Sequence, residues 1–473
     1  MMNGDGAMKK IFLLIALVCT IAPVHAQSFS AGELESRAIE RRAIEAVNWG
    51  MPAVNTERMV QALKSAGGDW NQIVIMPKLQ NWKNQTLTPN ADLVYLLPFI
   101  NTRDAGPMVL EIPPADDGSI TGSIMDLWQN PLETVGPAGV DKGKGGKYLI
   151  LAPNTQQSVP DGYIPLPSSY FENYALLRSV LRSGSAEGLA KAVAYAKRIK
   201  LYPLAQAGNP PMTNFVDVSE AVFDASIPYD VRFFESLDRT IQSESWLDRD
   251  KAMIDPLRSI GIEKGKPFNP DSRTKEILDT AAREARAWLN LRFETSFPPY
   301  YEGRQWVVVA PPEALATMPT RFETTDRYSV DARGLFYYYV FASEKHLGGG
   351  QFYLFTLRDG AGNFLDGGKT YRVTIPANVP VKQYWSAVSY DRATHTFFRD
   401  VPHVGVGSQT QGLQTNADGS VDLIIGPTPP SDMASNWIPT RAGSQYEFCI
   451  RFYGPDKPLF DKTWKLPDVQ EVK

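Results

Sequence analysis

The sequence predicts a mainly β, multidomain protein with a helical middle region, and three observations support this prediction. Residues 73–152 contain short β-rich runs that alternate with Pro, Gly, Asn and Asp, which favours a β-sandwich over βαβ units. Residues 172–293 carry apolar side chains at spacings of three to four, which is typical of helices. Beyond Tyr300, short strand patterns separated by turn residues indicate a second sandwich or a jelly roll.

The length and charge of the chain narrow its class. Its 473 residues suffice for two or three separate cores. With 48 basic and 52 acidic side chains the formal charge is −4, and no block of Lys and Arg extends beyond short pairs. Because binding to a phosphate backbone requires a clustered basic surface, we expect no nucleic-acid partner.

The first 26 residues are predicted to be a signal peptide. Lys9 and Lys10 precede an apolar run, and Val24 and Ala26 supply small side chains for cleavage near Ala26. The mature chain would then begin at Gln27 and be periplasmic or secreted. The apolar run is shorter than the roughly 20 residues of a membrane span, so no stable membrane insertion is expected, a retained anchor being the alternative.

Two details of this segment leave alternatives open. Met8 stands directly before the lysines, so both Met1 and Met8 are candidate start sites. Cys19 suggests a lipoprotein, but the branched Val18 before it occupies a position where a small residue is usual.

Cleavage would leave Cys449 as the single cysteine, so no intramolecular disulfide can form. It lies in an apolar strand pattern, which predicts a core residue. Only His346, His395 and His403 would remain, too few for a histidine-rich zinc site. No metal and no cofactor are expected.

Helices are predicted at the start of the mature chain and in its middle. Ser30 and Glu33 form a capping-box pattern that begins a helix, which Gly50 would end, and a second short helix would follow Asn55. The further predicted helices are Glu172 to Leu181, Ala186 to Lys200, Tyr229 to Leu237 and Thr274 to Phe293.

Strands are predicted in both β regions. In the first they are Met108 to Ile112, Ser123 to Leu127 and Tyr148 to Ala152, and in the second Trp306 to Ala310, Leu335 to Ala342, Gln351 to Leu357, Tyr371 to Ile375, Tyr384 to Tyr390, Val421 to Ile425 and Tyr446 to Tyr453. The expected domains are residues 27–167, a mainly helical region at 168–299, and residues 300–473.

Two sets of motifs carry a resemblance to known families. Trp49-Gly50-Met51-Pro52, Leu87 to Tyr95 and Asp126-Leu127-Trp128 resemble the bacterial domain of unknown function 1254. Tyr384-Trp385-Ser386, Tyr390-Asp391, Asn416 to Ser420, Asn436 to Pro439 and Arg451-Phe452-Tyr453 resemble its usual companion, domain of unknown function 1214. The resemblance implies an Ig-like β-sandwich, a helical insert and a C-terminal jelly-roll-like domain, and no established activity. The chain departs from the usual motif at position 93, where Leu replaces a threonine.

The segment around Asn90 supplies the candidate site. Asn90 can close a turn after Pro89, with Asp92 and Tyr95 on the strand that follows. Asp126 and Trp128 form a second same-face pair. If the two pairs converge, Asp92 and Asp126 are candidates for acid/base hydrolysis and Asn90, Tyr95 and Trp128 for ligand binding, because paired carboxylates cleave glycosidic bonds and aromatic faces stack on sugars. The alternative is that these residues only hold turns and satisfy buried hydrogen bonds.

The functional hypothesis is therefore an exported protein that binds or hydrolyses a polar organic ligand, such as a glycan or another envelope component, in a cleft between the two β domains. The alternative is a non-catalytic structural or assembly protein of the envelope. Whether the chain is an enzyme, and its oligomeric state, stay open. In the C-terminal domain Trp437 is expected to be architectural, and Arg451, sharing a strand face with Cys449 and Tyr453, is expected to snorkel or to pair with a carboxylate.

Overall fold

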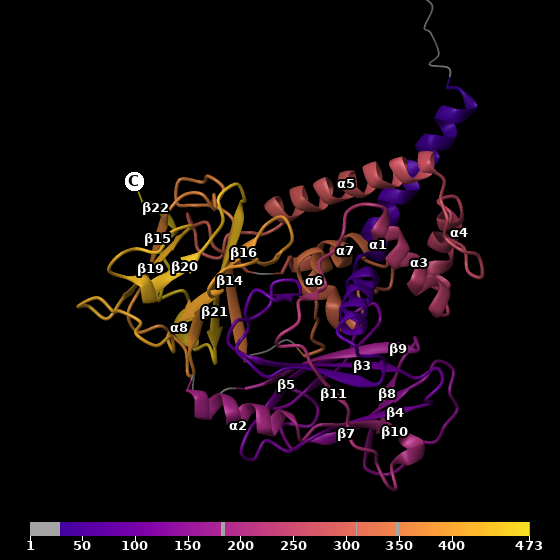
Figure 1. The fold of residues 1–473 in the computed structure, drawn as a ribbon, viewed down its shortest axis with the longest axis horizontal. Helices are drawn as coiled ribbons and strands as arrows, with labels where there is room; N and C mark the ends of the chain where they lie inside the picture. Colours follow the sequence, from indigo (N-terminus) through magenta and orange to yellow (C-terminus); the bar gives the residue numbers. More distant parts are fainter. Residues whose placement is uncertain (1–28, 181–184, 309, 347–349, 473) are drawn as a thin grey trace, which may run out of the picture.

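A computed structural model describes residues 29–180, 185–308, 310–346 and 350–472 (Figure 1). An N-terminal β-sandwich, a group of helices and a C-terminal β-sandwich meet along their sides. This confirms the predicted class, a β-rich multidomain fold with a helical region. The predicted signal peptide lies outside the described residues.

The N-terminal sandwich consists of two sheets that share one core. The first has the order β11 (Phe215–Asp217), β1 (Gln72–Met76), β3 (Val94–Asn101), β9 (Glu172–Ser179), β5 (Ile120–Asp126) and β6 (Pro131–Val135). The second has the order β10 (Lys200–Pro203), β4 (Met108–Ile112), β7 (Gly146–Leu151) and β8 (Tyr163–Pro167). Ile73 and Leu96 of the first sheet and Leu110 and Ile150 of the second pack in the same buried cluster. Strands β9, β10 and β11 lie beyond residue 167, the expected end of this domain, and complete its sheets.

Strand β9 corrects the helix predicted from Glu172 to Leu181. It pairs with β3 on one side and β5 on the other, so it lies inside the sheet. Both faces of the sheet are covered, and the strand is therefore an almost continuous buried run instead of an alternating one. Such a run has no clear period of two, which is why its apolar spacing resembled that of a helix.

Helix α1 (Ala31–Ser65) begins at the predicted capping box, with Ser30 accepting from the Glu33 amide and the Glu33 side chain accepting from the Ser30 amide. The predicted break at Gly50 and the separate second helix are wrong, because α1 continues through Gly50 and Pro52. A Cβ at Gly50 would lie 2.9 Å from Leu237 Cδ1 of α3, so glycine permits close helix packing here.

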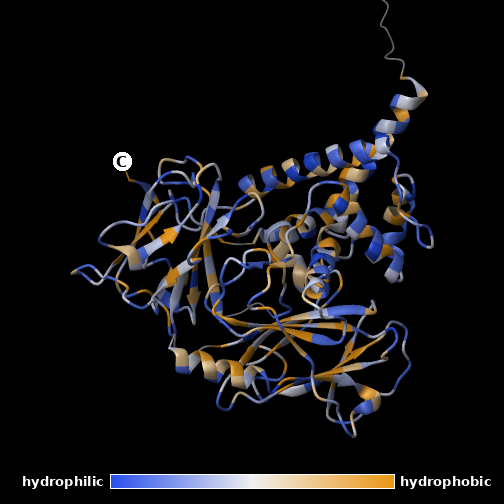
Figure 2. Ribbon diagram, viewed as in Figure 1, coloured by the Kyte–Doolittle hydropathy of each residue, from blue (hydrophilic) through white to orange (hydrophobic). Residues whose placement is uncertain are grey.

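Four helices pack against α1 in the centre of the molecule, namely α3 (Val231–Ser243), α4 (Lys251–Arg258), α5 (Ser272–Thr295) and α7 (Val330–Tyr339), and α6 (Pro312–Thr317) contacts α7. Helix α2 (Ala186–Ala196) packs instead on β3 and β9 of the N-terminal sandwich, and the short α8 (Lys457–Phe460) lies near the end of the chain. Figure 2 shows the alternation of polar and apolar residues along α5, whose buried face packs on α1. In the part of the chain that the structure describes, no helix combines the length and the apolar character that a membrane span needs.

Helix α7 replaces the strand predicted from Leu335 to Ala342. Every residue from Ala332 to Tyr339 is buried, so the helix has no polar face to reveal a period of 3.6. Its aromatic run is typical of strands, which explains the wrong prediction. Gly334 lets the helix approach α1, since a Cβ there would meet Asn48 Oδ1 at 2.0 Å.

The C-terminal domain is also a two-sheet sandwich. One sheet has the order β13 (Val307–Val308), β14 (Gln351–Thr356), β21 (Tyr446–Tyr453), β16 (Trp385–Asp391) and β17 (Thr396–Phe397), with β18 (Gly405–Gly407) also paired to β16. The other has the order β20 (Trp437–Pro439), β19 (Val421–Gly426), β15 (Tyr371–Ile375) and β22 (Gln470–Glu471). Leu354, Ile450, Val373 and Leu423 join the two sheets in one core.

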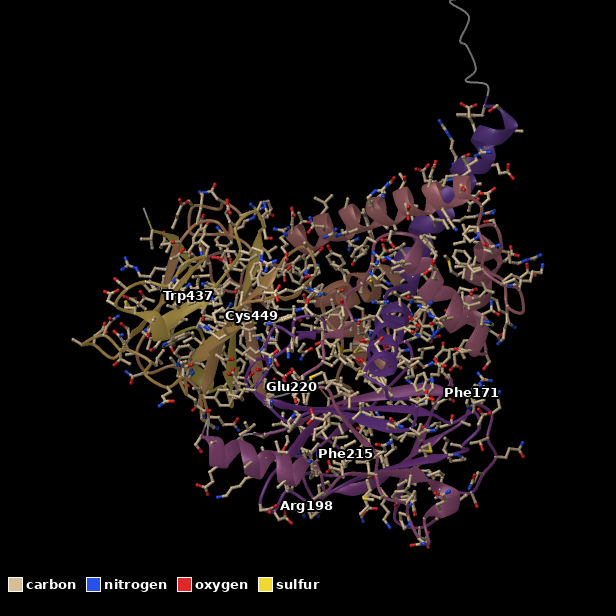
Figure 3. All side chains as sticks on the ribbon, viewed as in Figure 1. Phe171, Arg198, Phe215, Glu220, Trp437 and Cys449 are labelled. Carbon is tan, nitrogen blue, oxygen red and sulfur yellow. The ribbon has the colours of Figure 1, made fainter. Side chains whose placement is uncertain are left out.

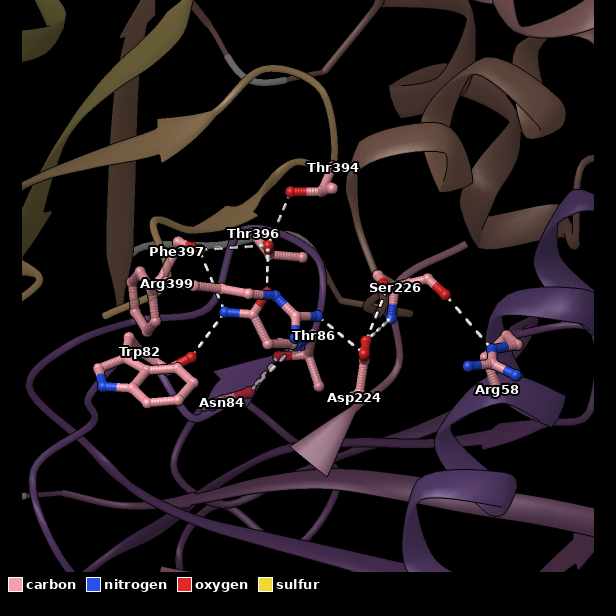
Figure 4. Close-up of polar contacts among 11 residues, drawn as sticks. Arg58, Trp82, Asn84, Thr86, Asp224, Ser226, Thr394, Thr396, Phe397 and Arg399 are labelled. Carbon is pink, nitrogen blue, oxygen red and sulfur yellow. Dashed lines mark hydrogen bonds and ion pairs between the residues drawn. The ribbon is translucent and has the colours of Figure 1, made fainter. Parts of the chain in front are cut away.

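A polar seam connects the N-terminal and C-terminal halves (Figure 4). Two short parallel strands, β2 (Asn84–Gln85) and β12 (Phe223–Asp224), lie next to β17. Gln85 Nε2 donates to the Phe397 carbonyl at 3.1 Å and Gln85 Oε1 accepts from Thr396 Oγ1 at 2.9 Å. Arg399 pairs with Asp224 at 2.7 Å. These contacts hold the two β domains in one arrangement.

Candidate functional site

A cavity of about 480 Å³ lies between the two β domains and the helices. Three walls form it: the first sheet of the N-terminal sandwich, the segment from α6 to α7, and strands β14 and β21 of the C-terminal sheet. Apolar side chains provide much of the lining, among them Leu93, Leu176, Met318, Phe336, Phe341 and Phe355. Cys449 also lines the cavity, and Figure 3 shows it nearer to the helical region than Trp437.

Each β wall presents an arginine flanked by cross-strand neighbours. In the N-terminal sheet Arg178 lies opposite Tyr95 on one side and Thr121 on the other. In the C-terminal sheet Arg451 lies between Tyr353 and Ser386. Residues at paired positions share a face, so each arginine lies within a polar row on an otherwise apolar wall.

Arg451 is only 3% exposed and forms no ion pair with a described residue. Its Nη2 donates to the carbonyls of Thr88 at 3.0 Å and Pro89 at 3.4 Å. Its guanidinium also lies 5.1 Å from the centre of the Tyr353 ring. The expectation that Arg451 snorkels or pairs with a carboxylate is therefore wrong, because backbone carbonyls and aromatic rings surround the charge. The expected shared face is present, since Cys449, Arg451 and Tyr453 all line the cavity.

The loop around Asn90 docks onto this C-terminal wall. The Asn90 side-chain amide donates to the Tyr453 hydroxyl, and the Tyr390 hydroxyl donates to the Pro89 carbonyl at 2.6 Å. Asn90 Oδ1 accepts from the Asp92 amide at 2.9 Å, which closes the turn as the sequence predicts. The backbone amide of Asn90 donates to the Tyr95 hydroxyl at 2.9 Å. Asn90 and Tyr95 both line the cavity.

Asp92 lies beside Arg451 without bonding to it. Its Oδ2 is buried and has no hydrogen-bond partner. Burial raises the pKa of the Asp92 carboxyl, while the nearby Ser386 hydroxyl and the Arg451 charge act to lower it. Protonation of this carboxyl is therefore easier than in water.

Asp126 and Trp128 belong to a different cluster. Asp126 is 1% exposed, and its Oδ1 accepts from the backbone amides of Trp128 at 2.9 Å and Asn130 at 3.0 Å. The Trp128 ring lies 4.6 Å from that of Trp49 and 4.8 Å from the Arg333 guanidinium. Burial is the largest cause of the raised pKa of Asp126. Neither residue is among the described residues that line the cavity.

The structure thus unites part of the predicted set and adds residues that the sequence did not indicate. Asn90 and Tyr95 line the cavity. Asp92 does not line it but lies near Arg451, which does. Arg178 was missed because its segment was predicted to be a helix, although an arginine within an apolar strand would have been a useful signal. Among the described residues no group of three or more His, Cys, Asp and Glu side chains could hold a metal ion.

Comparison with known families identifies both halves. Residues 70–203 match the family described as "Protein of unknown function (DUF1254)", and residues 350–457 match "Protein of unknown function (DUF1214)". The chain belongs to the proteins that carry these two domains in this order. The cavity lies where the two domains meet, together with the helices between them. No curated protein matches the chain.

One solved structure supports the fold of this DUF1254 and DUF1214 protein. The crystal structure of the VPA0106 protein from Vibrio parahaemolyticus is 16% identical, with a TM-score of 0.52 over 92% of this chain and 100% of that chain. A Burkholderia cenocepacia protein is 10% identical, with a TM-score of 0.38 over 93% and 95% of the two chains. At such identities the first similarity shows the fold alone.

Proposed function

We propose that the protein binds a small organic molecule in the cavity between its two β domains. One observation supports this best: the walls of the cavity carry two arginines and several hydroxyl groups, and some of their buried polar atoms have no hydrogen-bond partner, namely Thr121 Oγ1, Arg178 Nε, Tyr384 OH, Arg451 Nε and Arg451 Nη1. Roughly 90% or more of buried polar groups in proteins have partners. A polar group of a bound ligand would lie beside the charged and hydroxyl side chains that carry these atoms.

The size and lining of the cavity fit this role. Its volume of about 480 Å³ falls within the range of roughly 300 to 1,000 Å³ of small-molecule sites, which are mostly apolar with a few placed polar groups. A polar part of the ligand would meet Arg178 and Arg451, and the rest would meet Leu176 and Phe355. An envelope component or a glycan derivative with an apolar portion is compatible with such a lining.

The geometry favours binding over hydrolysis by the predicted carboxylate pair. Asp126 uses its carboxylate to hold the turn at Trp128 and Asn130. Asp92 shares no hydrogen-bond partner with it in the described part of the chain. Acid/base chemistry by both groups on one substrate therefore has less support than simple retention of a ligand.

Export is part of the proposal. Its support is the sequence pattern of Lys9, Lys10, the apolar run and Val24-His25-Ala26. N-terminal sequencing of protein from the cell envelope should give a mature end at Gln27. An intact end near Met8 on envelope protein would contradict cleavage.

A cavity-filling variant tests the binding function. Ala342 lines the cavity and is half-buried, so Ala342→Trp should fill part of the space. The control is Ala417→Trp in an exposed turn. Titration with the neutral fluorescent probe N-phenyl-1-naphthylamine should show binding to the wild type and to the control, and affinity about tenfold weaker, or about 1.4 kcal/mol, for Ala342→Trp. Equal binding by both variants, or no binding by any protein, would overturn the proposal and leave the structural role as the better account.

A further inference from the structure

The chemistry of the cavity walls narrows the ligand class further, on the basis of the proposed binding function. Both guanidinium groups carry a positive charge at every physiological pH. Arg451 retains Nε and Nη1 without partners although it is 3% exposed. Arg178 retains Nε without a partner, and its side chain is 14% exposed. Removing such a charge from water is costly unless an opposite charge or hydrogen bonds compensate for it.

Glu344, which also lines the cavity, forms a long ion pair with Arg178, whereas Arg451 has no ion pair with a described residue. Glu344 Oε1 lies 3.8 Å from Arg178 Nη1, beyond hydrogen-bond distance. Asp92 lies near Arg451 without an ion pair. Burial raises the pKa of the Asp92 carboxyl, so it keeps its proton more readily than an exposed carboxyl does.

Tyr353 links the two arginines across the cavity. Its ring lies 5.1 Å from the Arg451 guanidinium, and the charges of both Arg178 and Arg451 act on its hydroxyl. Its hydroxyl already donates to Gln351 Oε1. Both arginines also line the cavity, so both contribute positive charge to its walls.

We propose that the cavity selects an amphipathic carboxylic acid, with the carboxylate held by Arg451 and Arg178 and the apolar body packed against Leu176, Met318, Phe341 and Phe355. Carboxylate oxygens accept strong, charge-assisted hydrogen bonds from guanidinium groups. The apolar walls bury the aliphatic or aromatic portion of the same molecule. No residue of the chain needs to react for this selection to operate.

Displacement of N-phenyl-1-naphthylamine by three probes of equal chain length tests the inference: decanoate, decanol and decylamine, below their aggregation concentrations. Decanoate should displace the dye from the full chain at a concentration about tenfold or more below that of decanol, since an ion pair adds affinity that an alcohol lacks. Decylamine should be the weakest, because its charge would face two arginines.

Variants separate the role of charge from the integrity of the cavity. Arg178→Gln should weaken decanoate about tenfold while leaving decanol within about twofold, and Arg178→Lys should recover part of the decanoate affinity. Arg451→Gln should have a similar effect, but it also loses the bonds to Thr88 and Pro89, so Arg178 carries the test. The matched control is Arg372→Gln on β15, whose side chain is exposed.

The outcomes distinguish this inference from the binding function itself. Equal affinity for decanoate and decanol, or equal losses for both in Arg178→Gln, would overturn the carboxylate assignment. Binding of the dye in the same experiment would still support the proposed binding function. Failure of the dye to bind would remove the proposed function together with this inference.

Discussion

The side-chain amide of Asn90 donates a hydrogen bond to the hydroxyl of Tyr453, a residue 363 positions further along the chain. The same loop receives Arg451 Nη2 on the carbonyl of Thr88 at 3.0 Å. The Leu87 to Tyr95 motif of the DUF1254 half and the Arg451-Phe452-Tyr453 motif of the DUF1214 half therefore bond directly to each other. Both motifs contribute residues to the wall of the cavity.

Asn90→Ala should destabilise the protein by about 1 to 3 kcal/mol, because the Asp92 amide and the Tyr453 hydroxyl each lose a buried partner. Urea unfolding followed by tryptophan fluorescence measures this loss. Asn209→Ala, at an exposed position, provides the control and should change the free energy of unfolding by less than about 0.5 kcal/mol. Equal stability of the two variants would show that the contact between the motifs contributes little.

Asp126→Ala should lower stability and leave binding in the cavity intact. The amides of Trp128 and Asn130 would each lose an acceptor at a cost of about 1 to 3 kcal/mol. Binding of N-phenyl-1-naphthylamine to the folded variant should match the wild type. A folded, fully stable variant that no longer binds or turns over a ligand would restore the acid/base role for Asp126.

Trp437→Ala should destabilise by about 3 to 5 kcal/mol, because Trp437 is 9% exposed and its removal leaves a cavity. Its Nε1 donates to the Gly426 carbonyl at 2.8 Å, which ties β20 to β19. Trp437→Phe keeps much of the ring volume and loses the bond, so a smaller loss is expected in the same urea experiment. An unchanged melting temperature with lost ligand binding would show instead that Trp437 contacts the ligand.

Stability should fall as pH rises from 6 to 9, because the buried carboxyl of Glu244 lies beside the half-buried carboxyl of Glu172 and both have raised pKa values. Burial is the first cause that raises the pKa of Glu244 to about 8 and that of Glu172 to about 7, and the Glu172 charge raises Glu244 further. Because the folded protein holds these protons more tightly than the unfolded chain, their contribution to stability is complete below the unfolded pKa near 4.5. That contribution is lost as the pH rises through the folded pKa values of about 7 and about 8.

Urea midpoints at pH 6 and pH 9 measure this loss, which should be about 1 to 3 kcal/mol. Glu244→Gln should flatten the profile, since an amide does not titrate. The exposed Glu276→Gln on α5 should keep the wild-type slope. Parallel profiles for all three proteins would contradict a role for the Glu172 and Glu244 pair.

Alkylation of Cys449 should be slow in the folded protein. Its side chain is 1% exposed and burial raises its pKa to about 11, so little reactive thiolate exists at pH 8. Iodoacetamide should modify it readily only in urea, and dithiothreitol should not change the melting temperature. Rapid alkylation without urea would show that the cavity opens widely in solution.

The elements predicted correctly from the sequence are those whose apolar residues recur at a clear period. Strands Met108–Ile112, Tyr371–Ile375 and Tyr446–Tyr453 have the predicted bounds, and the amphipathic α5 was predicted nearly to its ends. The predictions failed at β9 and α7, where both faces or all sides are covered and neither a period of two nor of 3.6 remains. Local pattern alone cannot assign such elements.

The candidate site was predictable only in part for the same reason. Asn90 and Tyr95 stand within a few residues of each other, and turn chemistry places them together. Arg178 and Arg451 are 273 positions apart and come to line the same cavity only when the two sheets dock. Asp126 and Trp128 stand two residues apart at the end of β5, a spacing that predicted a shared face. Asp126 instead bonds to the Trp128 amide, and the Trp128 ring packs against Trp49 of α1, away from the cavity.

The seam of β2, β12 and β17 and the bonds of the Asn90 loop also make each half of the protein depend on the other for partners of buried polar groups. A protein with only one half would expose the tyrosine and leucine side chains that now line the cavity. In the C-terminal half alone, Arg451 would also lose the Thr88 and Pro89 carbonyls that accept its hydrogen bonds. Exchange of a half between distant relatives would have to bring matching partners for Gln85, Asn90 and Arg451 with it.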